Sequence, residues 1–370
     1  MPVTDPLAVP GPAGFAGQWL GQRIVFADGG LGRLADEVSA LGATAVVLVA
    51  SQRGDLPARV AGLLGGRLAG QWADVRQHVP AEVAAGLVAR SREVGADLLV
   101  SVGGGSALGL AKIAARDAGL PVLAIPTTYA GSEMTPVWGI TEGTAKRTGR
   151  DLRVLPRTVI YDPALLAALP PRLAGVSGMN ALAHCVEALY APLADPLTSL
   201  GALEGARLIA TVLPAACRPG EESARRGLLW ASCLAGRSFG TAGGSLHHGI
   251  CHLLGGSAGL PHAQTHAIVL PHAVAFLGPA ISPALARLAV ALAADPADVP
   301  GAIWDLGRRV GTPHGLRALG LAERALPALA EALVTAGPAS PRPLDRPAVL
   351  ALLTAAWSGD RPASEAVLKG

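Results

Sequence analysis

Five of the nine histidines fall within only twenty residues, 247–266. They are His247, His248, His252, His262 and His266. His248 and His252 are four residues apart and therefore share one helix face, and His262 follows in a Gly/Pro-rich loop. Imidazole exchanges protons near neutral pH and is a common metal ligand. A single buried histidine is usually a packed core residue, but this concentration predicts a site of proton transfer or metal binding.

A second pair of polar residues has helical spacing. Asn180 and His184 are four residues apart in "SGMNALAHCVEALY", 177–190, and lie on one face of the predicted helix. They are candidates to join the histidines in one site.

A glycine-rich turn follows the apolar run 97–102. Gly103, Gly104 and Gly105 allow close approach of the backbone to an anion, and Ser106 is expected to cap the next helix. The helix N-terminus adds free N–H groups and a positive dipole end. The turn predicts a diphosphate site, with a tight turn that binds nothing as the alternative.

Two further stretches accompany the glycine turn. "PTTYAGSEMTPVWG", 126–139, offers the hydroxyls of Thr127, Thr128 and Ser132 for phosphate or carboxamide contacts, with its aromatic residues Tyr129 and Trp138 bordering a cleft. A plain polar loop is the alternative. Ser51 directly follows the strand-like run 44–50. Many nucleotide-binding domains have an acidic residue at this point, which repels the 2′-phosphate of NADPH. With serine there, weak discrimination between NADH and NADPH is expected.

The elements that would position these residues differ between the two halves of the chain. Apolar, β-branched runs alternate with helical periodicity up to about residue 165, which is the pattern of a parallel sheet covered by helices. The runs are 23–26, 44–50, 97–102, 121–126 and 158–163. Beyond residue 166 the segments are long and rich in Ala and Leu. We predict an α/β nucleotide-binding domain over 1–165 and an all-helical domain over 166–370.

Composition excludes several classes of protein. Hydrophobic residues make up 51% of the chain and charged residues 15%, with 30 basic against 27 acidic residues and no block of like charge. Nucleic-acid and membrane partners are therefore not expected. The four cysteines lack the spacing of a metal or disulfide framework, and the N-terminus lacks a signal peptide, so a cytoplasmic protein with reduced thiols is expected.

The order of these motifs resembles the iron-containing alcohol dehydrogenase family, and within it the maleylacetate reductase branch. The stretches that carry the resemblance are "QHVPAEV" (77–83), "YAGSEMTPVWG" (129–139), "KRTGRDLRVLP" (146–156), "SGMNALAHCVEALYA" (177–191) and "LPHAQTHAIVLPHA" (260–273). The resemblance implies a dehydroquinate synthase-like fold with a cleft between two domains. It also implies a homodimer and a cofactor site that includes Lys146.

The family's four metal-ligand positions fall on Asn180, His184, His248 and His262. The first is Asp in the metal-dependent alcohol dehydrogenases, and a neutral amide there predicts weak binding of Fe²⁺ or Zn²⁺. Reduction of a C=C bond conjugated to a ketone spreads charge into an enolate, which a hydrogen-bond donor can stabilise. His248 or His252 is the expected proton donor, with His184 and His262 orienting the substrate.

The resemblance implies reduction of maleylacetate, an unsaturated oxo-dicarboxylate, to 3-oxoadipate with NADH or NADPH. One departure is Gly249, where that branch typically has lysine; Gly259 and Gln264 also replace residues that are usually acidic. Two alternatives stay open: a metal-dependent alcohol dehydrogenase or aldehyde reductase, and a biosynthetic relative with another substrate or with lyase or cyclase chemistry.

Overall fold

The computed structural model describes residues 20–52, 54–143 and 145–362. Its N-terminal half is built on a parallel six-stranded sheet of order β1-β8-β5-β4-β2-β3. The strands are β1 (Arg23–Phe26), β2 (Val46–Ala50), β3 (Leu68–Trp72), β4 (Leu98–Gly103), β5 (Val122–Pro126) and β8 (Thr158–Tyr161). A separate antiparallel hairpin pairs β6 (Val137–Glu142) with β7 (Ala145–Arg150).

Helices cover both faces of this sheet, as the doubly apolar strands require. The helices are α1 (Leu34–Ala40), α2 (Leu56–Leu64), α3 (Ala81–Glu93) and α4 (Gly105–Ala118). Val47 and Val49 of β2 belong to the core cluster that contains α3 and α4 residues, whereas Val46 and Leu48 belong to the one with α1 and α2 residues. Alternate side chains of one strand thus fill two cores.

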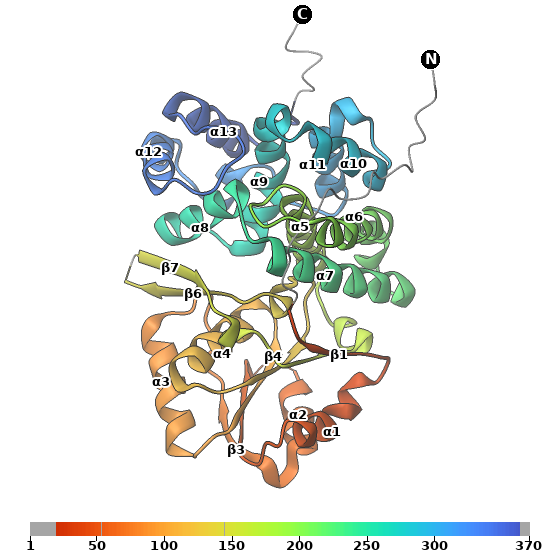
Figure 1. Cartoon of the computed structure of the whole chain (residues 1–370), viewed down its shortest axis with the longest axis vertical. Coiled ribbons are helices and arrows are strands. Elements are labelled where there is room, and N and C mark those ends of the chain that lie inside the picture. Colours follow the sequence, from red (N-terminus) through yellow and green to blue (C-terminus); the bar gives the residue numbers. More distant parts are fainter. Residues whose placement is uncertain (1–19, 53, 144, 363–370) are drawn as a thin grey trace, which may run out of the picture.

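The second half of the chain is helical and stacks on the α/β half (Figure 1). Its helices are α5 (Pro171–Ala188), α6 (Pro196–Ala216), α7 (Glu222–Ala242), α8 (Leu246–Ala258), α9 (His262–Leu277), α10 (Ser282–Leu292), α11 (Val299–Arg309), α12 (Leu326–Ala336) and α13 (Arg346–Ser358). Helix α5 is buried along most of its length and packs against α6, α7 and α9. The predicted fold class is confirmed, and the domain boundary near residue 165 stays a prediction.

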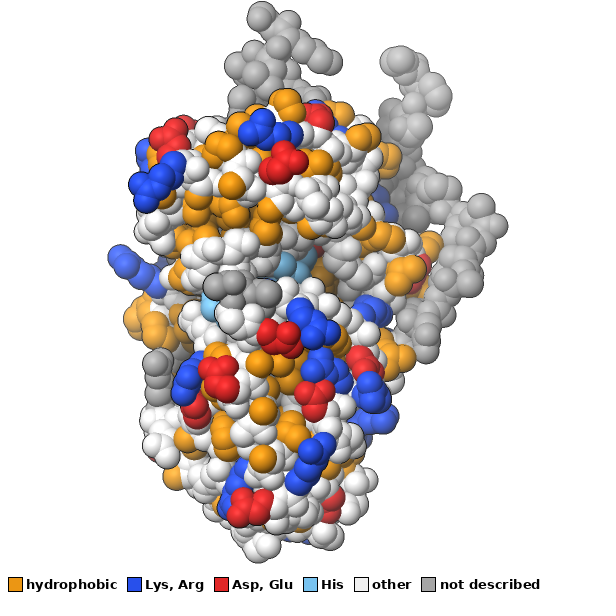
Figure 2. Space-filling view, turned by 90° about the vertical axis from the view of Figure 1, so that its left-hand side faces the viewer, with side chains coloured by type: hydrophobic (Ala, Val, Ile, Leu, Met, Phe, Trp, Pro, Cys, Tyr) orange, Lys and Arg blue, Asp and Glu red, His pale blue; other side chains and the backbone are white. Residues whose placement is uncertain are grey.

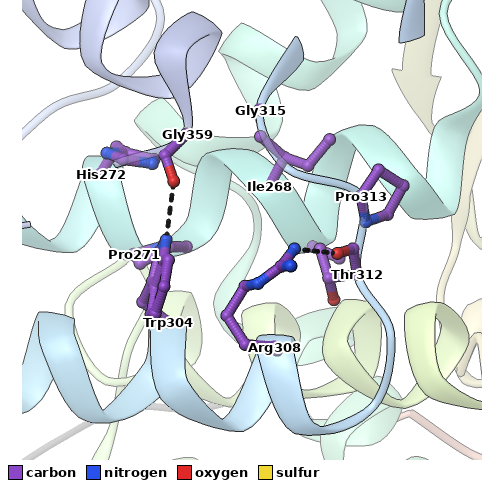
Figure 3. A pocket seen from close by; sticks show the side chains of 11 residues that line it. Ile268, Pro271, His272, Trp304, Arg308, Thr312, Pro313, Gly315 and Gly359 are labelled. Carbon is purple, nitrogen blue, oxygen red and sulfur yellow. Dashed lines mark hydrogen bonds between the residues drawn. The ribbon is translucent and has the colours of Figure 1, made fainter. Parts of the chain in front are cut away.

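The outer helices are joined by hydrogen bonds to loop backbone. Trp304 of α11 donates to the Gly359 carbonyl (2.9 Å), and Arg308 donates to the Thr312 carbonyl (2.7 Å) around a small cavity that His272 also lines (Figure 3). This cavity lies among helices of the C-terminal half and is lined by none of the residues predicted for the site.

Candidate active site

The glycine turn lies at the carboxyl end of β4, directly before α4. Gly103 has a φ of 141°, a conformation that L side chains rarely adopt, and Gly105 begins α4 with an exposed backbone. The expectation for Ser106 is wrong: Gly104 is the N-cap residue, no side chain caps the helix, and Ser106 lies inside the first turn. The first N–H groups of α4 are therefore free of a side-chain cap and available to an anion.

Two other predicted positions lie at the same sheet edge. A Cβ on Gly104 would lie 2.8 Å from the Thr128 methyl group, and the Thr127 N–H donates to the Gly103 carbonyl (3.0 Å). Ala50 pairs with Val102, which places Ser51 just beyond the end of β2, beside the glycine turn. The structure thus brings together the predicted cofactor positions Ser51, Gly103–Ser106, Thr127 and Thr128.

A fully buried lysine anchors the loop that follows Thr128. Lys112 of α4 donates to the carbonyls of Ser132 (2.6 Å), Thr135 (2.7 Å) and Val137 (3.0 Å). Burial lowers the pKa of Lys112 to about 7, and the nearby Glu133 carboxyl opposes this shift. The sequence analysis missed Lys112 because its position in an ordinary helix gives no sign of what its head group contacts. Ser132 contributes its backbone carbonyl to this anchor.

The same loop reaches the histidine half of the molecule. The Asn180 amide donates to the Ala130 carbonyl (3.4 Å), and a Cβ on Gly131 would lie 3.2 Å from His184 Nδ1. Gly131 has a φ of 72° and faces Gly236 of α7 so closely that a Cβ on Gly236 would lie 2.1 Å from the Gly131 carbonyl oxygen. Glycine is therefore required on both sides of this contact. One loop thus connects the anion-binding turn with α5.

Tyr129 and Trp138, expected to border a cleft, differ in their surroundings. Tyr129 is fully buried in the core, and its hydroxyl has no partner among the described residues, so that expectation is wrong for this residue. Trp138 is half-buried, and the Arg116 guanidinium lies 4.2 Å from its ring centre.

His184 and His248 come together at the centre of the helical half. Their ring centres are 5.1 Å apart in a stacked arrangement, and the Phe239 ring lies 4.5 Å from the first and 4.1 Å from the second. Both histidines are nearly inaccessible to solvent, and burial holds the pKa of each well below its usual value. Both rings are therefore neutral at pH 7.

A buried carboxyl orients His248. Glu187 Oε2 pairs with His248 Nδ1, and Glu187 Oε1 accepts the backbone N–H of Ser245 (3.1 Å) and of His248 (3.3 Å). Burial raises the pKa of Glu187 to about 7. The pairing leaves the other ring nitrogen, Nε2, for the substrate side. The sequence analysis missed Glu187, although its spacing of three from His184 and seven from Asn180 places all three on one helix face.

His252 and His262 lie nearer the surface. His252 is half-buried, His262 is exposed, and their rings are 6.3 Å apart and nearly parallel. His262 is the first residue of α9, so its expected place within a loop is wrong. Figure 2 shows histidine side chains in a hollow between the two halves of the molecule. This hollow is the candidate active site.

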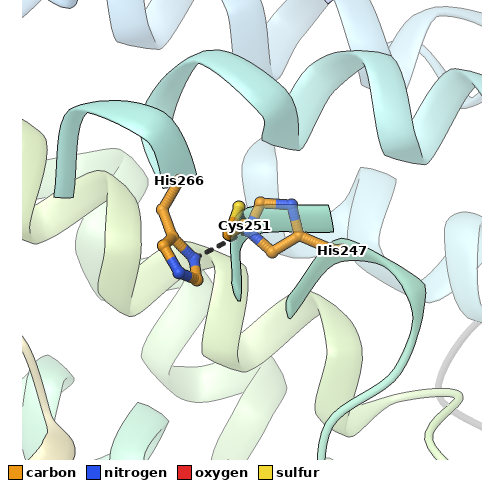
Figure 4. Close-up of side chains that lie close together, drawn as sticks. All are labelled: His247, Cys251 and His266. Atoms are coloured by element: carbon orange, nitrogen blue, oxygen red, sulfur yellow. Dashed lines mark hydrogen bonds between the residues drawn. The ribbon is translucent and has the colours of Figure 1, made fainter. Parts of the chain in front are cut away.

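The remaining two histidines form a buried group with Cys251 (Figure 4). His247 Nε2 and His266 Nδ1 are hydrogen-bonded at 2.9 Å, and Cys251 Sγ lies 3.8 Å from His247 Nε2. His266 also packs against His248 and His262, with ring centres 4.6 and 4.3 Å away. His247 and His266 are fully buried and pack beside His248.

Lys146 lies on β7 and faces α8. A Cβ on Gly255 would lie 3.7 Å from the Lys146 Nζ and 3.6 Å from His78 Cε1. A Cβ on Gly256 would lie 2.9 Å from the Lys146 Cβ, so glycine permits the close packing of the hairpin on α8. Burial lowers the pKa of Lys146. The structure therefore places this predicted cofactor residue beside the histidine helix.

His78, quoted for the resemblance but not assigned a role, occupies a strained turn before α3. His78 and Val79 have φ values of 64° and 50°, which cost about 1–3 kcal/mol each for such residues. Thr141 of the hairpin holds the turn through bonds to the His78 carbonyl (2.7 Å) and the Val79 carbonyl (3.0 Å).

Gly249 of α8 is packed against the loop that follows α12. A Cβ on Gly249 would lie 2.6 Å from the Pro338 Cβ, and the Ser245 hydroxyl donates to the Ala339 carbonyl (2.8 Å). The residue that departs from the resembling branch thus contacts a proline that leaves no room for a side chain.

The predicted metal-ligand set, Asn180, His184, His248 and His262, is made of neutral side chains. Among the described residues, His184, His248 and His262 do not bring three ligand atoms within 4.8 Å of one another, whereas His247, Cys251 and His266 do. Asn180 Oδ1 and His184 Nδ1 are buried without a partner, and the set contains no anionic ligand. His247 and His266 already satisfy each other through their hydrogen bond.

A helix N-terminus without a side-chain cap at a parallel-sheet edge, joined by one loop to a histidine cluster between helices, is the arrangement typical of a nucleotide-binding α/β enzyme. Two family models match the chain: "Iron-containing alcohol dehydrogenase" over residues 21–163 and "Fe-containing alcohol dehydrogenase family, C-terminal" over 175–357. The chain belongs to the iron-containing alcohol dehydrogenase family.

Three relatives are similar over nearly the whole chain. A maleylacetate reductase of Burkholderia cepacia is 44% identical, with 92% of this chain and 97% of that protein aligned. Maleylacetate reductase 2 of Cupriavidus pinatubonensis is 45% identical, with 92% of this chain and 96% of that protein aligned. The crystal structure of maleylacetate reductase from Agrobacterium tumefaciens is 39% identical and covers 94% and 99%, with a TM-score of 0.87. Across the described residues, every helix is too short or too polar to cross a membrane.

Proposed function

We propose that the protein is a maleylacetate reductase, which adds hydride from NADH or NADPH to the conjugated C=C bond of maleylacetate and releases 3-oxoadipate. The observation that carries the proposal is the loop at 127–137, which contacts the glycine turn at one end and Asn180 and His184 at the other. The reductases similar along more than nine-tenths of the chain support it. A homodimer in the cytoplasm belongs to the same proposal.

The cofactor diphosphate would bind the N-terminus of α4, where Gly103–Ser106 leave backbone N–H groups free of a side-chain cap. Thr127 and Thr128 would contact the cofactor beside it, and Ser51 places no negative charge against a 2′-phosphate. Bound NADH or NADPH supplies the hydride. We propose no step through a metal, because the ligand set implied by the resemblance contains no anionic group.

Once hydride has added, the substrate becomes an enolate that must be protonated. His252 is the better-placed group to pass a proton from solvent to the enolate, because it is half-buried and its ring lies 6.3 Å from that of the exposed His262. His248 lies one helical turn away, where its pairing with Glu187 would leave the second ring nitrogen for the substrate. His184 stacks on His248 and fixes its plane.

The test is oxidation of NADH and NADPH with freshly prepared maleylacetate, beside a panel of simple aldehydes and with EDTA present. We expect turnover of maleylacetate that survives chelation. His248→Ala and His252→Ala should each lower kcat at least about a hundredfold, the scale of general-acid catalysis, while the Kd of NADH stays unchanged. An enzyme that turns over only aldehydes, and only with metal, is instead an alcohol dehydrogenase. Full activity in both variants would remove the histidines from the mechanism.

A further inference from the structure

His78 and Lys146 meet at Gly255 of α8, one helical turn from His252. Both groups lie against Gly255 of α8, where a Cβ would be 3.6 Å from His78 Cε1, 3.8 Å from His78 Nδ1 and 3.7 Å from Lys146 Nζ. His252 precedes Gly255 on the same helix by three residues and shares its face. Burial, followed by the Lys146 charge, lowers the pKa of His78 and of His252, which agrees with this proximity.

Neither the Lys146 ammonium nor His78 Nε2 is held by a polar contact with the surrounding described residues. Within the described parts of the chain, Lys146 has no hydrogen-bond or ion-pair partner, whereas its neighbour Arg147 pairs with Glu142. His78 Nε2 is buried and likewise without a partner there. The Lys146 ammonium and His78 Nδ1 both lie within 4 Å of one point beside Gly255, and an anion there would give the ammonium the polar partner it lacks and accept a hydrogen bond from the ring.

The turn that presents His78 lies between the two halves of the site. Val79 packs against Gly109 of α4, where a Cβ would be 3.1 Å from the Val79 Cγ2, and Thr141 of the hairpin holds the backbone of both turn residues. A left-handed conformation at two non-glycine residues persists only where surrounding contacts hold it. Here these contacts place one imidazole between the glycine-turn helix and the histidine helix.

We propose that His78 and Lys146 form the subsite that binds a carboxylate of the substrate on the α/β side of the hollow. The inference rests on the proposed function, because it assigns one end of a dicarboxylate to these two groups. Lys146 supplies the charge and the neutral His78 ring donates a hydrogen bond, which together make a charge-assisted contact. The reactive carbon would then lie between this subsite and His252.

Calorimetric binding of adipate and of hexanoate to the NADH-loaded enzyme tests the subsite without any turnover. These acids have the same chain length and differ in one carboxylate. We expect adipate to bind at least about tenfold more tightly than hexanoate, since a hydrogen bond to a charged group is worth that much or more. In Lys146→Met and in His78→Asn, which keeps a residue that tolerates the left-handed backbone, the preference should fall below about twofold.

Arg147→Met is the matched control, because it removes a cation from the same strand, and it should leave the preference unchanged. Fluorescence titration of NADH separates the competing role of Lys146: a tenfold rise in the Kd of NADH in Lys146→Met, with the adipate preference retained, would assign the lysine to the cofactor and overturn the subsite. Retention of the preference in both variants would also overturn it. Inactivity of the wild-type enzyme on maleylacetate, with the adipate preference present, would refute the proposed function alone.

Discussion

At position 180 an amide stands where the resemblance places the anionic metal ligand of the alcohol dehydrogenases. Asn180 Oδ1 has no partner among the described residues, and its Nδ2 makes only a long bond of 3.4 Å to Ala130. A carboxylate at this point would lie next to His184 and supply the missing charge. The identity of this single residue therefore governs how strongly the site holds a divalent ion.

Asn180→Asp should raise the affinity for Zn²⁺ by at least about tenfold, because it adds an anionic oxygen ligand. Calorimetric titration of metal-stripped protein with Zn²⁺ measures this directly. Asn180→Ala, which removes the amide without adding charge, should bind no better than the wild type. Cys251→Ser controls for the buried group of His247, Cys251 and His266: uptake that vanishes in this variant belongs to that group. One equivalent of EDTA-resistant metal in the wild type would contradict the prediction.

The residues that the sequence analysis identified are those with rare and local signals. Three consecutive glycines and a cluster of histidines are visible in the sequence itself. Glu187 and Lys112 were missed for a physical reason: a glutamate or lysine in a helix is usually solvated, and only the packing of distant segments shows that these two are buried. The role of His78 depends on a hairpin more than sixty residues away.

At the scale of elements, the core strands and the edge strand β1 were predictable from the sequence, whereas β3 and the hairpin strands β6 and β7 were not. The strands β2, β4, β5 and β8 are continuous apolar runs, which parallel sheets buried on both faces require. The edge strand β3 reads "LAGQW" and β7 reads "AKRTGR", so neither carries an apolar pattern. Helix α4 was placed within two residues of its start, because its cap was assigned to Ser106 and not to Gly104.

Lys112 of α4 holds the loop before β6 and the start of β6 through three hydrogen bonds. Its replacement tests how much these bonds contribute to the free energy of unfolding. Lys112→Met would leave the buried carbonyls of Ser132, Thr135 and Val137 without a donor, and Glu133 without its nearby cation. We expect the free energy of unfolding in urea to fall by about 3 kcal/mol or more. Arg116→Met, on the same helix but part of a surface ion pair with Asp117, should cost at most about 1 kcal/mol. Equal effects of the two changes would contradict this role of Lys112.

At the scale of the whole molecule, buried neutral histidines couple folding to pH. Burial lowers the pKa of His247 to about 3 and that of His272 to about 4, and holds those of His184, His248 and His266 well below the usual value. The unfolded chain titrates near 6.5, so below that pH it binds more protons than the native state. The stability that the neutral histidines contribute is fully present above about pH 6.5 and is lost as the pH falls. The raised pKa of Glu187 has the opposite effect on stability, because this carboxyl binds a proton more readily in the native state. It is a single group, whereas several histidines have lowered pKa values.

Each such histidine should remove about 1.4 kcal/mol of stability per pH unit between 6.5 and its native pKa. Urea unfolding at pH 8, 7, 6 and 5 measures the slope. His272→Leu should lower the slope of the unfolding free energy against pH by the contribution of one histidine. His272 suits this test because it is buried beside the cavity of Figure 3, away from the candidate active site. A midpoint that stays constant from pH 7 to pH 5 would show that the histidines gain their protons without unfolding.

The contact between Gly249 and Pro338 constrains the order in which this chain can change over evolutionary time. With the proline ring 2.6 Å from where a Cβ would lie, any larger residue at 249 is obstructed until position 338 has changed. A lineage could not acquire, by one substitution, the lysine that the resemblance predicts at that position. It would have to pass first through an ancestor altered at Pro338, a change that brings no benefit to the substrate site by itself. Positions 249 and 338, which are 89 residues apart, are thus expected to change together among descendants of this protein.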